Sequence, residues 1–137
     1  MRQILAGAFV GGCLAWQTQA AELVMFDSPA CSYCEQWDEE ISGIYPLTDE
    51  GRRAPLRRVS VHDEMPADLA RIGAVVYTPT FVLVDDGREV GRISGYPGED
   101  FFWGFLESLI ARLAMSSAAC DAYENSNSNQ TGRKTLC

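Results

Sequence analysis

Two cysteines stand three residues apart in the segment Cys31-Ser32-Tyr33-Cys34. An apolar run, 22–26, precedes the segment and a helical pattern follows it, so the pair is predicted where a strand gives way to a helix. The free backbone N–H groups and the dipole at a helix N-terminus stabilise a thiolate on the first cysteine. A thiolate attacks a disulfide of another protein, and a second thiol one turn along then resolves the mixed disulfide. The spacing predicts thiol–disulfide exchange, with Cys31 attacking and Cys34 resolving.

Three other interpretations of the pair remain open. It could be a static structural disulfide, or the fold could be redox-silent and serve only for binding. It could also be half of a zinc site, but such sites usually need four ligands, and the sequence has neither a second pair of this spacing nor any histidine besides His62. We therefore expect no metal and no cofactor. His62 is expected at the surface, at the end of a strand, rather than as a catalytic base.

The N-terminus has the pattern of an export signal. Arg2 is followed by the apolar and small residues 4–16, and Thr18-Gln19-Ala20 places small residues where a signal peptidase cleaves. Residues 1–20 are therefore predicted to be a secretory signal peptide, which leads to the periplasm. A lipoprotein signal ending at Cys13 is the alternative, but the apolar run continues past that cysteine.

Composition limits what the exported chain can be. The full chain of 137 residues has a net charge of −8, and losing residues 1–20 removes one arginine and no acid, which leaves −9. This length supports one domain, and this charge disfavours a nucleic-acid partner. Of the five cysteines, four would remain, an even number that suits an oxidising compartment.

The apolar pattern predicts alternating strands and helices. Strands are predicted at 22–26, 56–61, 80–84 and 88–94, and helices at 34–44, 66–72 and 101–113. A charged connection is expected at 49–55. The Asp-Gly step of Asp85-Asp86-Gly87 accepts the positive φ angles of a tight turn, so the last two strands are expected to form a hairpin. The order predicts an α/β fold, with a four-stranded mixed sheet, three helices, and helices on both faces.

Two further groups of residues lie outside this pattern of strands and helices: the C-terminal segment and several aromatic side chains. Residues 116–137 lack apolar periodicity and are expected to be a disordered tail, in which the pairing of Cys120 and Cys137 stays open. Tyr33 and Tyr96 are expected either to frame a substrate groove, or to pack in the core or simply lie exposed. The aromatic cluster near the start of the last helix is expected to be core, and comprises Phe101, Phe102, Trp103 and Phe105.

The strand, cysteine pair and helix, followed later by Tyr77-Thr78-Pro79-Thr80-Phe81, resemble the thioredoxin superfamily over residues 22–114, in a minimal, glutaredoxin-like order. The resemblance implies a thioredoxin-like domain at 21–115. It also implies a cis bond between Thr78 and Pro79, which is energetically accessible only before proline. In that superfamily the exposed backbone of the residue before the proline pairs with an incoming extended peptide, so Thr78 and Pro79 are the implied substrate-binding residues. Tyr33 is counted with them for the contact area of its aromatic ring.

Several segments are also similar to the SoxS family of periplasmic thiol–disulfide oxidoreductases, associated with bacterial sulfur oxidation. They are 26–37, Tyr45-Pro46, 54–58 and 66–69. This resemblance implies reduction of a disulfide on a sulfur-carrier protein of the SoxY type, with electrons from a membrane donor of the DsbD or CcdA type. A disulfide isomerase or oxidase, a cytochrome-maturation reductant and a non-enzymatic regulatory module remain alternatives.

One departure from the superfamily concerns a buried acid. Thioredoxins bury an aspartate six residues before the first cysteine, where it moves a proton to or from the resolving thiol, whereas this chain has Met25 there. Strand alternation places Asp27 on the same side as Met25, two residues closer to the cysteines. We expect Asp27 either to serve partly in proton transfer or only to cap the turn before Pro29.

Overall fold

The computed structural model describes the backbone of residues 21–127 and the side chains of residues 21–115. Its strands are β1 (Glu22–Asp27), β2 (Leu56–Ser60), β3 (Thr80–Asp85) and β4 (Arg88–Ser94). Its α-helices are α1 (Ser32–Trp37), α2 (Asp49–Arg53) and α3 (Glu99–Asn127). A π-helical turn, Asp38–Ser42, continues α1, and single 3-10 turns lie at Tyr45–Leu47 and Ala67–Leu69.

The four strands form one mixed sheet in the order β2-β1-β3-β4. β1 runs parallel to β2 and antiparallel to β3, and β3 pairs antiparallel with β4. The hairpin between β3 and β4 turns at Asp86 and Gly87, which both have positive φ (48° and 68°). The predicted α/β class, the mixed four-stranded sheet and the Asp-Gly hairpin are therefore confirmed. The number of α-helices among the described residues also agrees, although the second lies at Asp49–Arg53 and not at 66–72.

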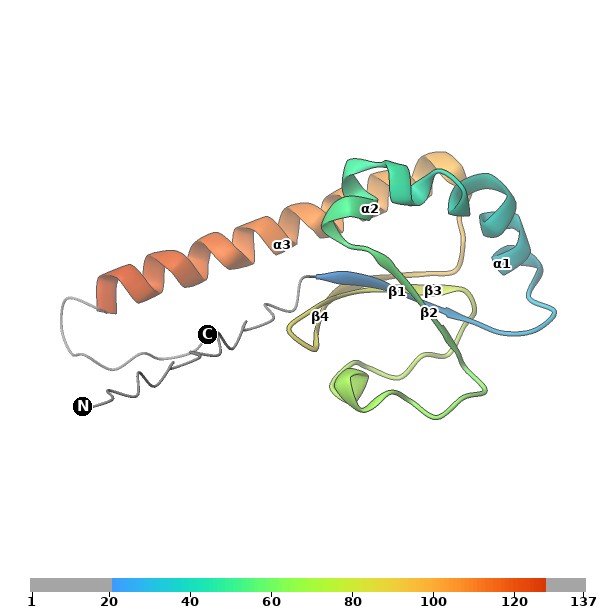
Figure 1. Ribbon diagram of the computed structural model, residues 1–137, viewed down its shortest axis with the longest axis horizontal. Coiled ribbons are helices and arrows are strands. Elements are labelled where there is room, and N and C mark those ends of the chain that lie inside the picture. Colours follow the sequence, from blue (N-terminus) through green and yellow to red (C-terminus); the bar gives the residue numbers. More distant parts are fainter. Residues whose placement is uncertain (1–20, 128–137) are drawn as a thin grey trace, which may run out of the picture.

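One face of the sheet carries the α-helices (Figure 1). The centre of this core is aromatic: Trp37 of α1 lies 5.3 Å from Phe81 of β3 and 5.9 Å from Phe102 of α3 between ring centroids, and all three side chains are fully buried. Leu23 and Met25 supply the β1 side of the same cluster, in agreement with the period of two along a strand. Packed rings of this kind fix how α1 lies on the sheet.

The opposite face is covered by the irregular segment 61–79, drawn green to yellow below the sheet (Figure 1). Its apolar cluster is smaller and mostly aliphatic, and comprises Val24, Phe26, Val59, Leu69, Val82 and Val84. The helix predicted at 66–72 is only the turn Ala67–Leu69. Few residues lie between Pro66 and Gly73, too few to offset the cost of nucleating an α-helix. The expectation of helices on both faces is therefore wrong for this face.

The charged connection expected at 49–55 contains α2 instead. Thr48 caps this helix, because its Oγ1 accepts the Gly51 N–H at 3.0 Å. Acids in the first turn and arginines in the last complement the helix dipole. Gly51 is required here, since a Cβ at this position would lie 2.0 Å from the Tyr45 carbonyl oxygen.

The last helix is longer than predicted. α3 continues to Asn127, so the expected disordered tail is wrong for residues 116–127. No glycine or proline interrupts residues 105–127, and a helix already nucleated by its packed first half extends one hydrogen bond per residue. The second half of α3 runs past the sheet (Figure 1).

The start of α3 only partly matches the expected aromatic core. Phe102 is buried and Trp103 stacks on Tyr45 with 6.2 Å between ring centroids, whereas Phe101 and Phe105 are exposed. One helix cannot turn all four aromatic side chains toward one face.

Several expectations lie outside the described residues. They are the signal peptide at 1–20 with Cys13, the end of the tail at 128–137 with Cys137, and the side chain of Cys120. Among the described helices, none combines the length and apolarity that a membrane-spanning segment requires.

Candidate functional site

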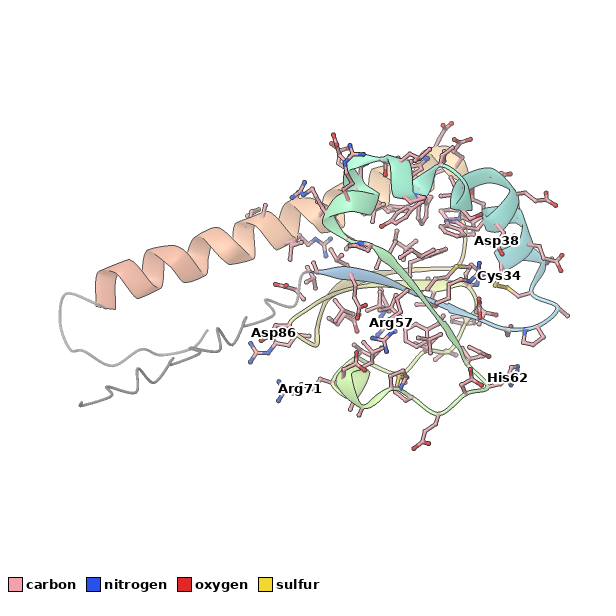
Figure 2. All side chains as sticks on the ribbon, viewed as in Figure 1. Cys34, Asp38, Arg57, His62, Arg71 and Asp86 are labelled. Atoms are coloured by element: carbon pink, nitrogen blue, oxygen red, sulfur yellow. A yellow bond between two sulfur atoms is a disulfide. The ribbon has the colours of Figure 1, made fainter. Side chains whose placement is uncertain are left out.

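Cys31 and Cys34 form a disulfide where β1 leads into α1 (Figure 2). Their Cα atoms are 5.2 Å apart and their sulfurs 2.11 Å apart. Cys31 is the N-cap of α1: its carbonyl accepts the N–H groups of Cys34 and Glu35, and its Sγ accepts the Cys34 N–H at 3.2 Å. Both residues are buried, Cys31 at 8% and Cys34 at 4% exposure. The helix start thus points a backbone donor at the first sulfur, as an anion-stabilising site requires.

The residues behind the disulfide form the aromatic core described above. Tyr96 belongs to that core, with 6.0 Å between its ring centroid and that of Phe102, so the core alternative for this tyrosine holds. Its hydroxyl donates a hydrogen bond to Glu40 of the π-helical turn. Burial and this hydrogen bond raise the pKa of the Tyr96 phenol, and the same bond lowers the pKa of the Glu40 carboxyl. Tyr96 therefore packs in the core and holds the π-helical turn after α1 through Glu40, and it does not frame a groove.

An arginine that the sequence analysis did not single out lies beside the cysteine helix. Arg58 of β2 donates from Nε to Asp27 Oδ2 at 2.9 Å and from Nη1 to Asp38 Oδ1 at 2.6 Å. The hydrogen bond to Asp38, followed by that to Asp27, raises the pKa of the Arg58 guanidinium. Asp38 sits directly after α1 (Figure 2), so one guanidinium joins the ends of β1 and α1. Among the described residues Asp27 accepts no turn N–H, so the capping role weighed for it is not seen.

The Thr78–Pro79 bond is cis, as the resemblance implied. Ser28, just after β1, and Thr78 share a hydrogen bond of 2.9 Å between their hydroxyl oxygens, which brings the cysteine loop beside the segment before the proline. Val76 and Tyr77 project from this segment, 75% and 68% exposed, and Tyr33 between the cysteines is 58% exposed. The structure therefore brings together the cysteine loop, Thr78 and exposed apolar side chains.

The remaining predicted positions lie apart from this arrangement. His62 is exposed after β2, on the side of the segment 61–79, and its backbone N–H donates to Ser60 (Figure 2). Among the described residues, no three His, Cys, Asp or Glu side chains group as metal ligands. The contacts that the sequence analysis missed, those of Arg58 and Ser28, join residues distant along the chain. In the sequence, what pointed toward these contacts was that charged and hydroxyl-bearing residues stand at the ends of the predicted strands.

Comparison with known proteins agrees with this geometry. A model of a thioredoxin-like domain matches residues 15–110. The periplasmic thioredoxin SoxS from Paracoccus pantotrophus, in its reduced form, is similar with a TM-score of 0.66 and 50% identity, over 68% of this chain and 98% of that one. A thioredoxin-fold protein from Helicobacter pylori is similar with a TM-score of 0.51 and 26% identity, over 64% of this chain and 67% of that one. No curated protein matches the sequence.

The fold, the disulfide at the start of α1 and the matched domain model agree with one another. The chain therefore belongs to the thioredoxin-like family, and it is a SoxS-like thiol–disulfide oxidoreductase with a disulfide between Cys31 and Cys34.

Proposed function

We propose that this protein works in the periplasm and reduces a disulfide on a sulfur-carrier protein of the SoxY type. The observation that carries the proposal is the 50% identity to a periplasmic SoxS, which extends over 98% of that protein. The predicted signal peptide supports the same compartment. Since a reductant in an oxidising compartment must be recharged, the proposal includes a membrane electron donor of the DsbD or CcdA type.

The reaction runs in two exchanges. In the reduced protein, the Cys31 thiolate attacks one sulfur of the carrier disulfide, and the other carrier sulfur leaves as a thiolate. The Cys34 thiolate then attacks Cys31 Sγ, which re-forms the Cys31–Cys34 bond and releases the reduced carrier. Two electrons have passed to the carrier, and the donor returns two to the protein. The N–H of Cys34, 3.2 Å from Cys31 Sγ in the oxidised pair, favours negative charge on Cys31 as the attacking sulfur.

The resolving step requires that Cys34 lose its proton, and Asp27 is the proposed acceptor. Asp27 lies on the helix-covered side of the sheet, on the same face of β1 as Met25, and Arg58 orients its carboxylate. Asp27→Asn keeps the shape of the side chain and removes the ionisable group. We expect it to flatten the pH dependence of mixed-disulfide resolution, measured by stopped-flow. An unchanged profile would exclude Asp27 from proton transfer.

The carrier segment is proposed to dock along the backbone of Thr78, beside Pro79 and Tyr33. The hydrogen bond between Ser28 and Thr78 supports this position, because it places the segment next to the cysteine loop. Exposed Val76 and Tyr77 offer apolar surface to the bound chain. An extended peptide adding to such an edge gains affinity from main-chain hydrogen bonds and specificity from side-chain contacts.

The proposal is tested by trapping. In the native host, Cys34→Ser in the full-length protein removes the resolving thiol, so the carrier stays bound to Cys31 and is identified by mass spectrometry after non-reducing purification. The matched control is the variant with both Cys31 and Cys34 replaced by serine. Capture of a sulfur carrier supports the proposal. Capture of cytochrome-maturation factors or of many unrelated secreted proteins identifies one of the alternative functions, and normal function of the double variant identifies a binding module.

A further inference from the structure

The segment that leads to the proposed docking position has few means of holding its shape. Residues 73–78 form neither helix nor strand, and we call them the docking segment. Val75 packs only partly against the small aliphatic cluster, whereas Val76 and Tyr77 point outward. Segments with so little buried apolar surface open easily unless specific polar contacts hold them.

Two side chains of β4 supply such contacts at the start of the docking segment. Glu89 Oε2 accepts the Gly73 N–H at 3.2 Å. Arg92 donates from Nη1 to the Ala74 carbonyl at 2.9 Å and from Nη2 to the Gly73 carbonyl at 3.1 Å. A Cβ on Gly73 would lie 3.0 Å from Arg92 Nη2, so the guanidinium rests directly against this backbone.

Glu89 and Arg92 also hold each other. Arg92 Nε donates to Oε1 at 2.6 Å and Nη2 donates to Oε2 at 2.5 Å, a bidentate pair. Their side chains are 23% and 24% exposed, so the pair is better shielded from water than an ordinary surface ion pair. Because Arg92 bonds both Glu89 and two carbonyls, its guanidinium is fixed in one orientation.

The other end of the docking segment is fixed as well. The hydroxyl of Thr80 donates to the Tyr77 carbonyl at 2.7 Å, and Thr78 is held by Ser28. The backbone is therefore fastened at both ends, while the side chains between remain exposed. A preformed backbone with free side chains is what strand addition by a partner requires.

We propose that Glu89 and Arg92 form a clamp that holds the docking segment in the conformation that receives the protein substrate. Both are positioning residues, because they contact neither the cysteines nor the proposed docking edge at Thr78. The inference rests on the proposed function, since it takes that edge as the place where substrate binds. If the released segment adopts the competent conformation only part of the time, the apparent affinity falls to that fraction of its full value.

The clamp is tested with Arg92→Gln and Glu89→Gln in the full-length chain. Insulin serves as the protein-disulfide probe and dithiobis-nitrobenzoate as the small one. We expect KM for insulin to rise about five-fold in each variant and kcat to change less than about two-fold. The reduction potential of the Cys31–Cys34 pair should stay at the wild-type value, and amide exchange at Gly73, whose N–H donates to Glu89, should accelerate. Unchanged KM for insulin together with unchanged exchange would overturn the clamp.

Two further variants separate positioning from simple stabilisation. The charge reversal Glu89→Arg with Arg92→Glu restores an ion pair but sets a carboxylate against the carbonyls of Gly73 and Ala74, so we expect KM to stay high. Recovery of the wild-type KM would show that only the ion pair matters and would refute the clamp.

The matched control, Asp49→Asn with Arg52→Gln, removes an exposed pair with the same spacing in α2 and should leave KM unchanged. A wild-type chain that reduces neither probe contradicts thiol–disulfide exchange itself, whereas an active wild type with unaffected variants contradicts the clamp alone.

Discussion

The two faces of the sheet are built in different ways. On the face that carries the cysteine pair, α1 and α3 pack through large buried rings, among them Trp37 and Phe102. On the other face, the segment 61–79 rests on a small aliphatic cluster that includes Leu69. Arginines fasten this segment from the two edge strands: Arg57 of β2 bonds Asp68, and Arg92 of β4 bonds the docking segment.

This difference separates two requirements of the site. The cysteine pair needs a fixed helix start, which extensive apolar burial provides, with Arg58 adding polar contacts to Asp27 and Asp38. A docking edge must stay exposed, so burial cannot hold it and directional polar contacts must do so. We therefore expect mutations on the helix-covered face to act on global stability, and those on the other face to act on local order and substrate affinity.

Phe102→Ala tests the helix-covered face and should have the largest effect on stability. It removes a fully buried ring that contacts four other aromatic residues, Trp37, Phe81, Tyr96 and Trp103. We expect the free energy of unfolding to fall by about 3–5 kcal/mol, measured by urea denaturation. Phe101→Ala, at an exposed neighbour on the same helix, is the control. A loss below 1 kcal/mol would contradict the view that this face carries most of the stability.

Leu69→Ala tests the opposite face. Leu69 is fully buried in the smaller cluster, so its truncation leaves a cavity there. We expect a loss of about 2 kcal/mol, at the lower end for buried leucines because an irregular segment can partly collapse into the space. Amide exchange should accelerate in residues 67–78 before it does in β1 or β3. Uniform acceleration through the sheet would show that the two faces unfold as one unit.

Arg57→Gln tests the ion pair with Asp68 through which β2 holds the segment 61–79. Arg57 donates to Asp68 at 2.5 Å and to Glu22 at 3.2 Å, and the hydrogen bond to Asp68 raises the pKa of the Arg57 guanidinium. Since the pair is partly exposed, we expect a loss of only about 0.5 kcal/mol in thermal denaturation. Exchange should rise around the turn Ala67–Leu69 and not at the docking segment. Equal changes at both places would mean that the two arginines do not act separately.

The smallest effect is the pH dependence of the clamp. The hydrogen bond from Arg92, together with the Gly73 N–H, lowers the pKa of the Glu89 carboxyl. A carboxyl with a lowered pKa in the folded state contributes stability at neutral pH that is lost as the pH falls through that pKa, below the ordinary value of about 4.3. Amide exchange of the docking segment, corrected for intrinsic rates, should therefore accelerate between pH 5 and roughly pH 3. The same acceleration in Glu89→Gln would assign it to another group.

The sequence predicted the parts of the molecule that local patterns encode. Apolar alternation located the four strands, and the Asp86-Gly87 turn closed the hairpin as expected. The cysteine spacing located the disulfide, and the resemblance located the cis bond before Pro79. The sequence analysis missed α2 because a helix of 5 residues is too short to show an apolar period. Its N-cap Thr48, the acids of its first turn and the arginines of its last turn were nevertheless visible in the sequence.

The contacts that shape the site were not predictable in the same way. Arg58 with Asp27, Ser28 with Thr78, and Arg92 with Gly73 each join residues 19 to 50 positions apart. Nothing in a charged or hydroxyl side chain specifies its partner until the sheet has set the register of the strands. Tyr96 shows the same limit, because an aromatic side chain with a polar tip suits either a groove or the core, and only packing decided between them.

The arginines that fasten the segment 61–79 also have a consequence for association with other chains. Arg57 and Arg92 lie on β2 and β4, the two open margins of the sheet, where unpaired backbone groups invite edge-to-edge aggregation. A strand joining either margin would have to dehydrate guanidinium and carboxylate groups that are already paired within the fold. These paired groups therefore disfavour uncontrolled strand addition at either margin of the sheet.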